Sequence, residues 1–529
     1  MYSQTFALGN FHPVWDHEQP DQKDGRIKVL AGKNFAWHTR GIFSAYASEL
    51  GCSVPTPAAA ATRHPGSFTV AKKNYHFFND GVYAHAGGAC IKVFECLRDR
   101  ASTTLEIYKW SYAYVGTVHY FSHPEWSEII YYDEHADTWD CFRADCWEGP
   151  VYGITHAENR LVVLLTDVVG WSMFDKGFDG FECSSYCGSG YQSLALIRYG
   201  CPFRVEPYAD GWLTFTDMGI MLSQPITDLV PDPEGDGVLS GPVIYKHQEL
   251  TFDNLAVGPC AIEHIDEKDV IWLSERGFWH LNRGALEPWQ PEWSGWFRDH
   301  WRDYSTLRPL DDVMLTSLRP FGWLGVSFKQ ANTDHYTNAA MYQFDLDRWG
   351  SFDYDHHGFA WKEEDGVKSR FRPFFAYFAV GNNWRNITHG TTDNSYVKLG
   401  PVTLHAETEL HEAENKQLLF ATRVGLSKRP WVDNYQQHAV RGTEDFWQKN
   451  EREVEIPSEF DLYVSGTEDG VHNETGQTEP LTRVQRQGYT ASYSGHVTGY
   501  SHLFTFECAN ATDFFDIRTI QASFIPVGI

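Results

Sequence analysis

One short motif recurs along this chain and constrains its fold more than any other feature. It consists of an apolar strand, a hydroxyl or amide side chain, an acid, a turn and a second apolar strand, and its clearest copy is LTFTDMGIML at residues 213–222. The acid and the hydroxyl can bond their own backbone and glycine tolerates positive φ, so each copy predicts a β-hairpin. The predicted turn residues are Asp80, Gly81, Asp167, Asp217, Gly219, Glu275, Gly277 and Asp393.

The copies return at a regular distance. Asp217 follows Asp167 by 50 residues and Glu275 follows Asp217 by 58. The distance from Asp80 to Asp167 is 87 residues and that from Glu275 to Asp393 is 118, so each is close to two such units. Four strands repeated about every 40–60 residues are typical of a β-propeller blade, which buries its faces only by stacking on neighbours. The sequence therefore predicts an all-β fold with a β-propeller of about six blades over residues 65–410.

A second recurring element supports the same interpretation. Residues 128–142 and 340–354 share an apolar strand, an Asp, a short turn and a Trp, which is Trp139 in the first segment and Trp349 in the second. Aromatic residues make up 16% of the chain, and 44 Gly and 24 Pro are spread through it. This composition favours many short strands and turns over helices, and we expect the two tryptophans to pack within blades.

The chain ends differ from the repeat. Residues 1–64 predict an extended N-terminal arm that ends in a flexible linker, PTPAAAATRHPGS. Residues 411–529 contain an acidic, turn-rich stretch followed by strands, and they predict an additional C-terminal β domain. We expect one of the strands of this domain to close the propeller ring.

Charge and cysteine usage limit the classes of function. The formal net charge is −27, whereas nucleic-acid binding needs clustered Lys and Arg, so the composition argues against simple nucleic-acid affinity. The N-terminal stretch lacks the pattern of a signal peptide, and no apolar run has the length of a membrane span. The ten cysteines are scattered without a Cys-x-x-Cys pair, and we expect buried free thiols in a reducing cytosol.

Motifs for catalysis are absent from the sequence. We find no Gly-x-Ser-x-Gly, no phosphate-binding loop and no His-Glu-x-x-His, and we predict no catalytic residue, no cofactor and no metal site. The segment DYDHHGF carries Asp353, Asp355, His356 and His357, which could ligate a divalent metal. Adjacent residues on a strand point to opposite faces, so the two histidines do not easily share one ion, and we expect a solvated loop here.

Glycoside hydrolysis is the enzyme class that is hardest to exclude. It needs only two carboxylates at a defined distance, and the chain has 70 Asp and Glu residues. Aromatic side chains can also stack on sugars, and Trp126, Trp139, Trp147 and Trp171 are candidates for such a platform, although blade packing is the commoner use of tryptophan. A propeller glycosidase or lyase, or a glycan-binding or receptor-binding tail protein, is therefore the alternative hypothesis.

Three parts of the sequence together resemble a known family. They are IKVLAGKNFAWHTRGIFSAYAS at residues 27–48, the hairpins FFNDGVYAH and GTTDNSYVKLG, and the closing segment at residues 488–528. This layout is similar to that of the tail accessory or nozzle proteins, also called head-to-tail connectors, of short-tailed bacteriophages. The resemblance covers most of the chain in layout.

The resemblance implies a function without catalysis. Proteins of this family are virion structural proteins that form a homo-oligomeric ring, commonly a hexamer, below the portal and adaptor proteins of the tail. The ring extends the DNA exit channel and takes part in the retention and ejection of packaged DNA. The net charge fits this role, because an acidic lumen lets DNA pass without specific binding. Assembly in the host cytoplasm would agree with the absence of a signal peptide.

Overall fold

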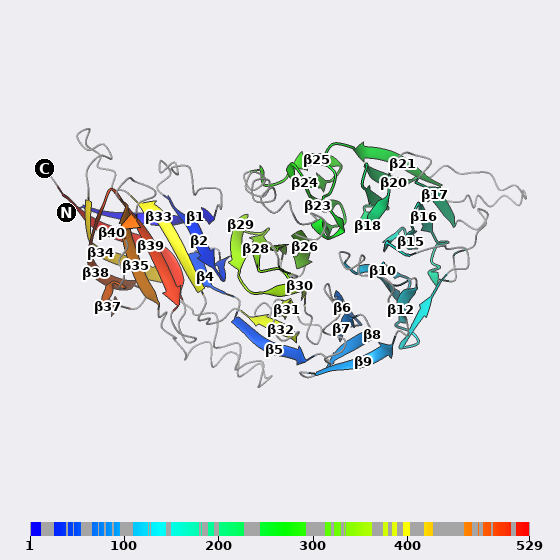
Figure 1. Cartoon of the computed structure of the whole chain (residues 1–529), viewed down its shortest axis with the longest axis horizontal. Coiled ribbons are helices and arrows are strands. Elements are labelled where there is room, and N and C mark those ends of the chain that lie inside the picture. Colours follow the sequence, from blue (N-terminus) through cyan, green and yellow to red (C-terminus); the bar gives the residue numbers. More distant parts are fainter. Residues whose placement is uncertain are drawn as a thin grey trace, which may run out of the picture.

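The structure is a computed structural model of the 529-residue chain. It describes residues 2–11, 26–38, 41–45, 47–53, 66–71, 73–78, 81–86, 89–95, 109–124, 126, 128–143, 150–178, 181, 189–194, 200–226, 244–291, 313–318, 322–329, 333, 335–361, 374–378, 383–388, 395–402, 417–426, 460–467, 474–475, 480–487, 490–508 and 515–527. Figure 1 shows two parts, a ring of small sheets and a second β domain that carries both chain ends. The prediction of an all-β propeller with an additional β domain is confirmed.

Seven four-stranded antiparallel blades form the ring within the described residues, one more than the expected six or so. Blade 1 contains β6 (Gly66–Val70), β7 (Lys73–Phe78), β8 (Gly81–Ala86) and β9 (Ala89–Glu95). Blade 2 contains β10 (Ser111–Val115), β11 (Val118–Ser122), β12 (Ile129–Asp133) and β13 (Thr138–Phe142). Blade 3 contains β14 (Gly153–Ala157), β15 (Arg160–Leu164), β16 (Val168–Trp171) and β17 (Gly190–Ser193).

The next two blades follow the same pattern. Blade 4 contains β18 (Pro202–Tyr208), β19 (Gly211–Thr216), β20 (Ile220–Ile226) and β21 (Ile244–Thr251). A short 3₁₀ turn, η7 (Pro259–Ala261), leads into blade 5, which contains β22 (Ile262–Asp266), β23 (Asp269–Ser274), β24 (Gly277–Asn282) and β25 (Ala285–Pro288). Every residue of the second strands β15 and β19 is buried, because these strands lie between two neighbouring blades.

The last two blades connect the ring to the rest of the chain. Blade 6 contains β26 (Val313–Leu318), β27 (Trp323–Phe328), β28 (Asn338–Gln343) and β29 (Arg348–Phe352). Blade 7 contains β30 (His356–Trp361), β31 (Phe374–Phe378) and β32 (Asn383–Thr388), and its fourth strand is β5 (Ala47–Ser53). The first strands of neighbouring blades contact one another from blade 2 to blade 7, and β30 contacts β6, so blade 7 lies next to blade 1 and the ring is closed.

The ring is therefore closed by a strand from the N-terminal region. β5 pairs along its length with β32 of blade 7 and also bridges β9 of blade 1, where Ser53 lies opposite Ala89. We expected the C-terminal domain to donate the closing strand. The sequence could not distinguish these donors, because an edge strand accepts any extended segment that reaches it.

The second domain is built from both ends of the chain. Its strands are β1 (Tyr2–Phe11), β2 (Arg26–Lys33), β3 (Phe35–His38), β4 (Gly41–Ser44), β33 (Ser395–Val402), β34 (Gln417–Leu426), β35 (Asp461–Thr467), β36 (Glu474–Thr475), β37 (Thr482–Gln487), β38 (Thr490–Gly499), β39 (Ser501–Cys508) and β40 (Asp516–Pro526). Residues 1–64, which we expected to form an arm, thus supply four strands here and one to the propeller. A strand forms because β1 can pair with β40 over six consecutive residue pairs, from Tyr2 opposite Phe524 to Ala7 opposite Thr519.

The two domains join at the outer edge of blade 6. β29 pairs with β3, where Ser351 lies opposite Phe35, so the sheet of blade 6 continues into the β domain. The Trp37 side chain is 2% exposed, and its indole N–H donates to the carbonyl of Trp349 at 2.7 Å. The Gln343 side chain accepts from the Trp37 N–H at 2.9 Å and donates to the Trp37 carbonyl at 3.0 Å. These buried hydrogen bonds fix the relative position of the two domains.

A polar network crosses the axis of the propeller. The Lys109 ammonium, before blade 2, pairs with the Glu263 carboxylate of blade 5 and donates to the Leu315 carbonyl of blade 6 at 3.3 Å. Arg204 of blade 4 donates to Glu206 at 2.6 Å and to the carbonyl of Lys109 at 3.3 Å. Because these long side chains join four blades, they occupy space at the centre of the ring.

Candidate functional site

The acid turns predicted from the sequence recur at one position in the blades. Asp167 lies between β15 and β16, Asp217 between β19 and β20, and Glu275 between β23 and β24, which are the second and third strands of blades 3, 4 and 5. Gly81 begins the third strand of blade 1, and Asp80 lies outside the described residues. Since the blades repeat around one axis, equivalent turns lie on the same face of the propeller.

The hydroxyl side chain, rather than the acid, forms these turns. The Thr216 hydroxyl accepts from the backbone N–H of Gly219 at 2.9 Å and of Met218 at 3.2 Å, and it donates to the Gly219 carbonyl. In blade 5 the Ser274 hydroxyl likewise accepts from the Arg276 N–H at 3.1 Å and donates to the Gly277 carbonyl at 3.0 Å. The hydroxyls thus make the bonds within the turns of blades 4 and 5, whereas the Asp217 carboxylate accepts from the Cys201 N–H outside its turn.

Two of the predicted glycines are required by their backbone geometry. Gly81 has φ of 150°, and a Cβ atom there would lie 2.1 Å from the carbonyl oxygen of Phe94. Gly277 has φ of 120°, a region that side-chain-bearing residues rarely adopt. Any substitution at either position strains the start of the third strand in its blade.

The predicted turn at Asp393 differs from the others. Asp393 itself lies outside the described residues, but the strands on either side of it are β32 of blade 7 and β33. β33 pairs with β2 and β39 of the β domain, so this segment joins two sheets instead of two strands of one blade. The echo in sequence arises because acid and small polar residues favour any turn.

The two predicted tryptophans occupy equivalent places in blades 2 and 6. Trp139 lies opposite Tyr132 on the neighbouring strand, and Trp349 lies opposite Tyr342. In each blade the tyrosine hydroxyl donates to an aspartate in the following turn at 2.6 Å, to Asp137 in blade 2 and to its equivalent in blade 6. Burial is the main cause that raises the pKa of Tyr132, and the hydrogen bond to Asp137 is the second. The hydroxyl of Tyr132 therefore keeps its proton and can donate a hydrogen bond to the aspartate.

The described tryptophans considered for a sugar platform pack on other aromatic side chains, and Trp139 among them is half-buried. Trp126 and Trp171 are 4% and 8% exposed, and Trp139 packs at 4.9 Å between ring centres on Tyr75 of blade 1. Trp147 lies outside the described residues. The described members of this set therefore hold blades together.

The segment DYDHHGF is divided: Asp353, Tyr354 and Asp355 lie in the partly exposed connection between β29 and β30, whereas His356 and His357 lie on the buried strand β30 and not in the expected solvated loop. His356 is the first residue of β30, and its ring nitrogens lie 2.9 Å from the Ser327 hydroxyl and 2.7 Å from the Tyr354 carbonyl. Burial lowers the pKa of His356 to about 3. Both nitrogens are engaged, so His356 serves the packing of blades 6 and 7, and the described residues contain no cluster of three metal-ligating side chains.

The expectation of buried free thiols holds for Cys260 and Cys508 but not for Cys201, which is exposed, Cys141, which is half-buried, or Cys90. Cys141, Cys201, Cys260 and Cys508 are free thiols, whereas Cys90 on β9 is disulfide-bonded. A disulfide depends on two Cα atoms lying within about 7 Å, and sequence spacing does not reveal such a distance.

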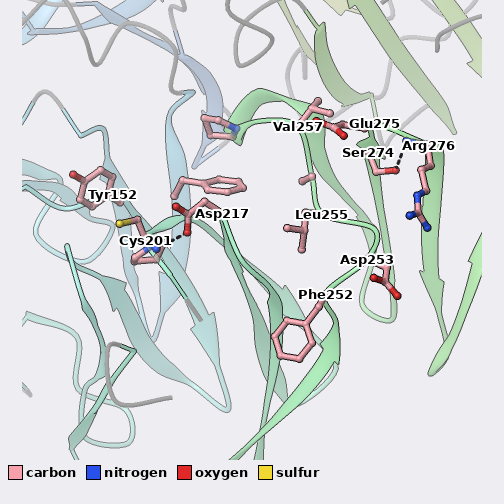
Figure 2. Close-up of a pocket in the computed structure, with 14 residues that line it drawn as sticks. Tyr152, Cys201, Asp217, Phe252, Asp253, Leu255, Val257, Ser274, Glu275 and Arg276 are labelled. Atoms are coloured by element: carbon pink, nitrogen blue, oxygen red, sulfur yellow. Dashed lines mark hydrogen bonds between the residues drawn. The ribbon is translucent and has the colours of Figure 1, made fainter. Parts of the chain in front are cut away.

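A pocket of about 520 Å³ opens on the turn face between blades 4 and 5. Asp217 and Cys201 lie on its blade 4 side, and Ser274, Glu275 and Arg276 lie on its blade 5 side (Figure 2). The connection between the blades forms the middle of the pocket with residues 252–259. The Asp217 carboxylate accepts from the Cys201 N–H at 2.6 Å, which holds the turn of blade 4 against the start of its own first strand.

The pocket brings together two of the predicted turns. Asp217 and Glu275 are 58 residues apart in sequence, and the packing of adjacent blades places both on the walls of one cavity. Phe203, Phe252, Leu255 and Val257 supply apolar surface beside these acids. The acids were visible as turn residues, but their shared cavity was not, because it depends on which blades are neighbours.

No helix in the described part of the chain combines the length and the apolar character that a membrane crossing needs.

No protein-family model and no curated protein matches the chain. Solved structures that are similar include a streptogramin B lyase, with a TM-score of 0.39 and 10% identity over 65% of this chain and 98% of that one. Virginiamycin B lyase from Staphylococcus aureus gives a TM-score of 0.38 and 9% identity over 62% and 95%. The WD40 repeats of RRP9 give a TM-score of 0.34 and 10% identity over 69% and 100%. The propeller assignment itself rests on the order of strands and the contacts between blades.

Proposed function

We propose that this chain is a non-enzymatic structural protein of a virion, a subunit of the ring-shaped tail nozzle or connector of a short-tailed bacteriophage. The observation that carries the proposal is the buried junction between blade 6 and the β domain, at which Trp37 and Gln343 exchange backbone and side-chain hydrogen bonds. It makes the propeller and the β domain one body, the layout that the sequence resemblance implies. A ring subunit under the pressure of packaged DNA needs such a fixed joint.

The lumen of the proposed ring lies between subunits. Lys109 and Arg204 cross the axis of the propeller, so double-stranded DNA does not run along that axis. The net charge of −27 lets an assembled ring repel the phosphate backbone and avoid binding it. DNA then passes through the lumen without specific contacts.

The test of the proposal is the assembly of the purified chain. Mixed with the portal and adaptor proteins of the same phage, the chain should form closed rings, which we expect to be hexamers, below the adaptor in electron micrographs. It should also give no band shift with double-stranded DNA at about 150 mM salt, where non-specific binders rely on basic patches. A chain that stays monomeric beside portal and adaptor, or that binds DNA, would overturn the proposal.

The alternative, a propeller glycosidase or lyase or a glycan-binding tail protein, makes a different prediction. An isolated chain of that kind would cleave or bind surface glycans without partners, and the cleavage would be lost on substitution of one carboxylate such as Asp217 or Glu275. Incubating the chain with host surface polysaccharide and measuring the release of reducing ends distinguishes the two hypotheses. Release of such ends by the wild type alone would favour the enzyme.

A further inference from the structure

The proposed function assigns no role to the pocket between blades 4 and 5. We propose that it binds a basic side chain, Arg or Lys, in an extended segment of a partner protein. The basic head lies between Asp217 and Glu275, and an apolar neighbour in the segment covers the rim. This inference goes beyond the proposed function and does not depend on it.

The charges of the pocket favour a cation. Asp217, Asp253 and Glu275 contribute three carboxylates to its lining, and Arg276 is the single basic side chain among the lining residues. Within the part of the chain that the structure describes, none of these four side chains forms an ion pair. A guanidinium or ammonium group placed between carboxylates makes charge-assisted hydrogen bonds, which are about twice as strong as neutral ones.

The acids approach the cavity from two different blades. Figure 2 shows Asp217 on one side and Glu275 on the other, with Leu255 and Val257 between them. Only the carboxylate oxygen that accepts from the Cys201 N–H is known to be engaged, so Asp217 has a second oxygen for a ligand. A ligand group that contacts both acids therefore bridges the two blades.

The apolar part of the pocket suits the stem of a long basic side chain. Phe203, Leu255 and Val257 line it beside the carboxylates, and Lys and Arg bury their methylene stems against apolar surface while the head stays polar. The volume of about 520 Å³ lies within the usual range for ligand pockets and is larger than one side chain. It therefore has room for the residues that flank the basic one.

Two large apolar side chains are exposed on or next to the pocket lining. Phe252 lines the pocket and is 46% exposed, and Met218, which follows the lining residue Asp217 in the turn of blade 4, is 56% exposed. Exposed Met and aromatic side chains are enriched at protein interfaces relative to the rest of the surface. A peptide that carries apolar residues beside its basic residue would cover both of them.

A glycan fits these observations less well. Phe252 is an exposed aromatic side chain of the kind found in sugar sites, but three carboxylates and one basic group give this pocket an excess of negative charge that neutral hydroxyl groups do not need. The net charge of −27 also accelerates the encounter with a basic partner and not with a neutral sugar. The observations therefore favour the peptide.

The test uses a pair of peptide probes that differ only in charge. The first is an acetylated and amidated Ala-Leu-Arg-Leu-Ala, and the second replaces Arg by the neutral isostere citrulline. By isothermal titration with the full chain we expect saturable binding of the arginine peptide with Kd below about 1 mM, and binding of the citrulline peptide about tenfold weaker. Raising the salt concentration should weaken the binding of the arginine peptide and leave that of the citrulline peptide unchanged.

The variants that complete the test preserve the fold. Asp217→Asn keeps an oxygen that can accept from the Cys201 N–H, and Glu275→Gln keeps the shape of its side chain. The double variant should bind both peptides equally weakly, while Glu249→Gln, at an exposed position of β21 outside the pocket, should bind like the wild type. Equal binding of both peptides by the wild type, no saturation below about 5 mM, or binding of a neutral oligosaccharide that displaces the peptide would overturn the proposal.

Discussion

The propeller and the β domain are built from the same kind of strand but are connected in opposite ways. In blades 2 to 5 every strand pairs with the next one in the chain, for example β10 with β11 and β22 with β23. In the β domain the first strand, β1, pairs with the last one, β40, and β2 pairs with β33. Among the described strands, the pairings within blades 2 to 6 are local in sequence, blade 7 alone takes a strand from the N-terminal region, and the pairings of β1 and β2 in the β domain join the two ends of the chain.

This difference makes the β domain dependent on the propeller. The 350 residues from 45 to 394 form a loop whose ends must meet before β4 and β33 can take their places in one sheet. Closing a flexible loop of that length costs about 5 kcal/mol of conformational entropy. A folded propeller removes this cost, because it holds the two ends together at the junction around Asn34 and Ser395, where the Ser395 hydroxyl donates to the Asn34 carbonyl at 2.9 Å.

The largest expected effect comes from a charge placed in either core. Ile520 of β40 and Ile271 of blade 5 are both fully buried, so Ile520→Asp and Ile271→Asp should each destabilise their domain by at least about 4 kcal/mol. Ile520→Asp should lose protection from hydrogen exchange in the β domain alone. Ile271→Asp should lose it in both domains, because the loop is then no longer closed.

The asymmetry between these two variants is the critical observation. Protection measured peptide by peptide by mass spectrometry reports each domain separately. A β domain that stays protected in Ile271→Asp would contradict the dependence on the propeller.

An intermediate effect is expected at the junction. Trp37→Ala removes a buried indole, its hydrogen bond to the Trp349 carbonyl and the contact with the Arg348 guanidinium, which lies 4.4 Å from the ring centre. We expect a loss of about 3–5 kcal/mol and two separate unfolding transitions in urea in place of coupled ones. Trp37→Phe keeps a ring beneath Arg348 and should lose only about 1–2 kcal/mol.

The matched partner for the junction variant is a tryptophan inside one blade. Trp272 is fully buried in blade 5 and donates to the Asn254 carbonyl at 2.8 Å. Trp272→Ala should lower the free energy of unfolding by a similar amount, but the propeller and the β domain should still unfold in one coupled urea transition. If both variants separate the two transitions, the coupling does not depend on the junction at Trp37.

The smallest effect is a difference in acid sensitivity. Among the described residues, burial is the main cause that lowers the pKa of four histidines in the propeller and of one in the β domain. The four are His76, His119, His247 and His356, and the one is His502. In the unfolded chain each would titrate near 6.5, so below that pH the unfolded state binds more protons and stability falls. Below pH 6.5 each buried histidine lowers the free energy of unfolding by up to about 1.4 kcal/mol per pH unit, until the pH reaches the pKa of that histidine in the folded state. This pKa is about 3 for His356.

The propeller should therefore lose stability faster than the β domain between pH 6.5 and 4. Urea midpoints at pH 7 and pH 5, followed by hydrogen exchange in each domain, measure the two slopes. His356→Gln should reduce the slope of the propeller and leave that of the β domain unchanged. Equal slopes in wild type and variant would mean that His356 is not a source of the acid sensitivity.

The blades could be predicted because their signals are short-range. The acid turns at Asp167, Asp217 and Glu275 lie where two consecutive strands reverse, and Trp139 and Trp349 lie in equivalent fourth strands. The tyrosine and aspartate that accompany each tryptophan also share one spacing in the sequence, Tyr-x-x-x-x-Asp-x-Trp. The blade count was one too low, because blade 7 draws its fourth strand from residues 47–53.

The sequence by itself determined which segments become strands and where tight turns reverse them, since apolar alternation, glycine and hydroxyl side chains act within a few residues. Only the tertiary structure decided the rest. β5 closes blade 7, Lys109 reaches across the axis to Glu263, Cys90 forms a disulfide, and Asp217 faces the pocket that Glu275 also lines. Each of these depends on residues that are far apart in the chain, and their proximity results from the packing of whole blades, which no local pattern specifies.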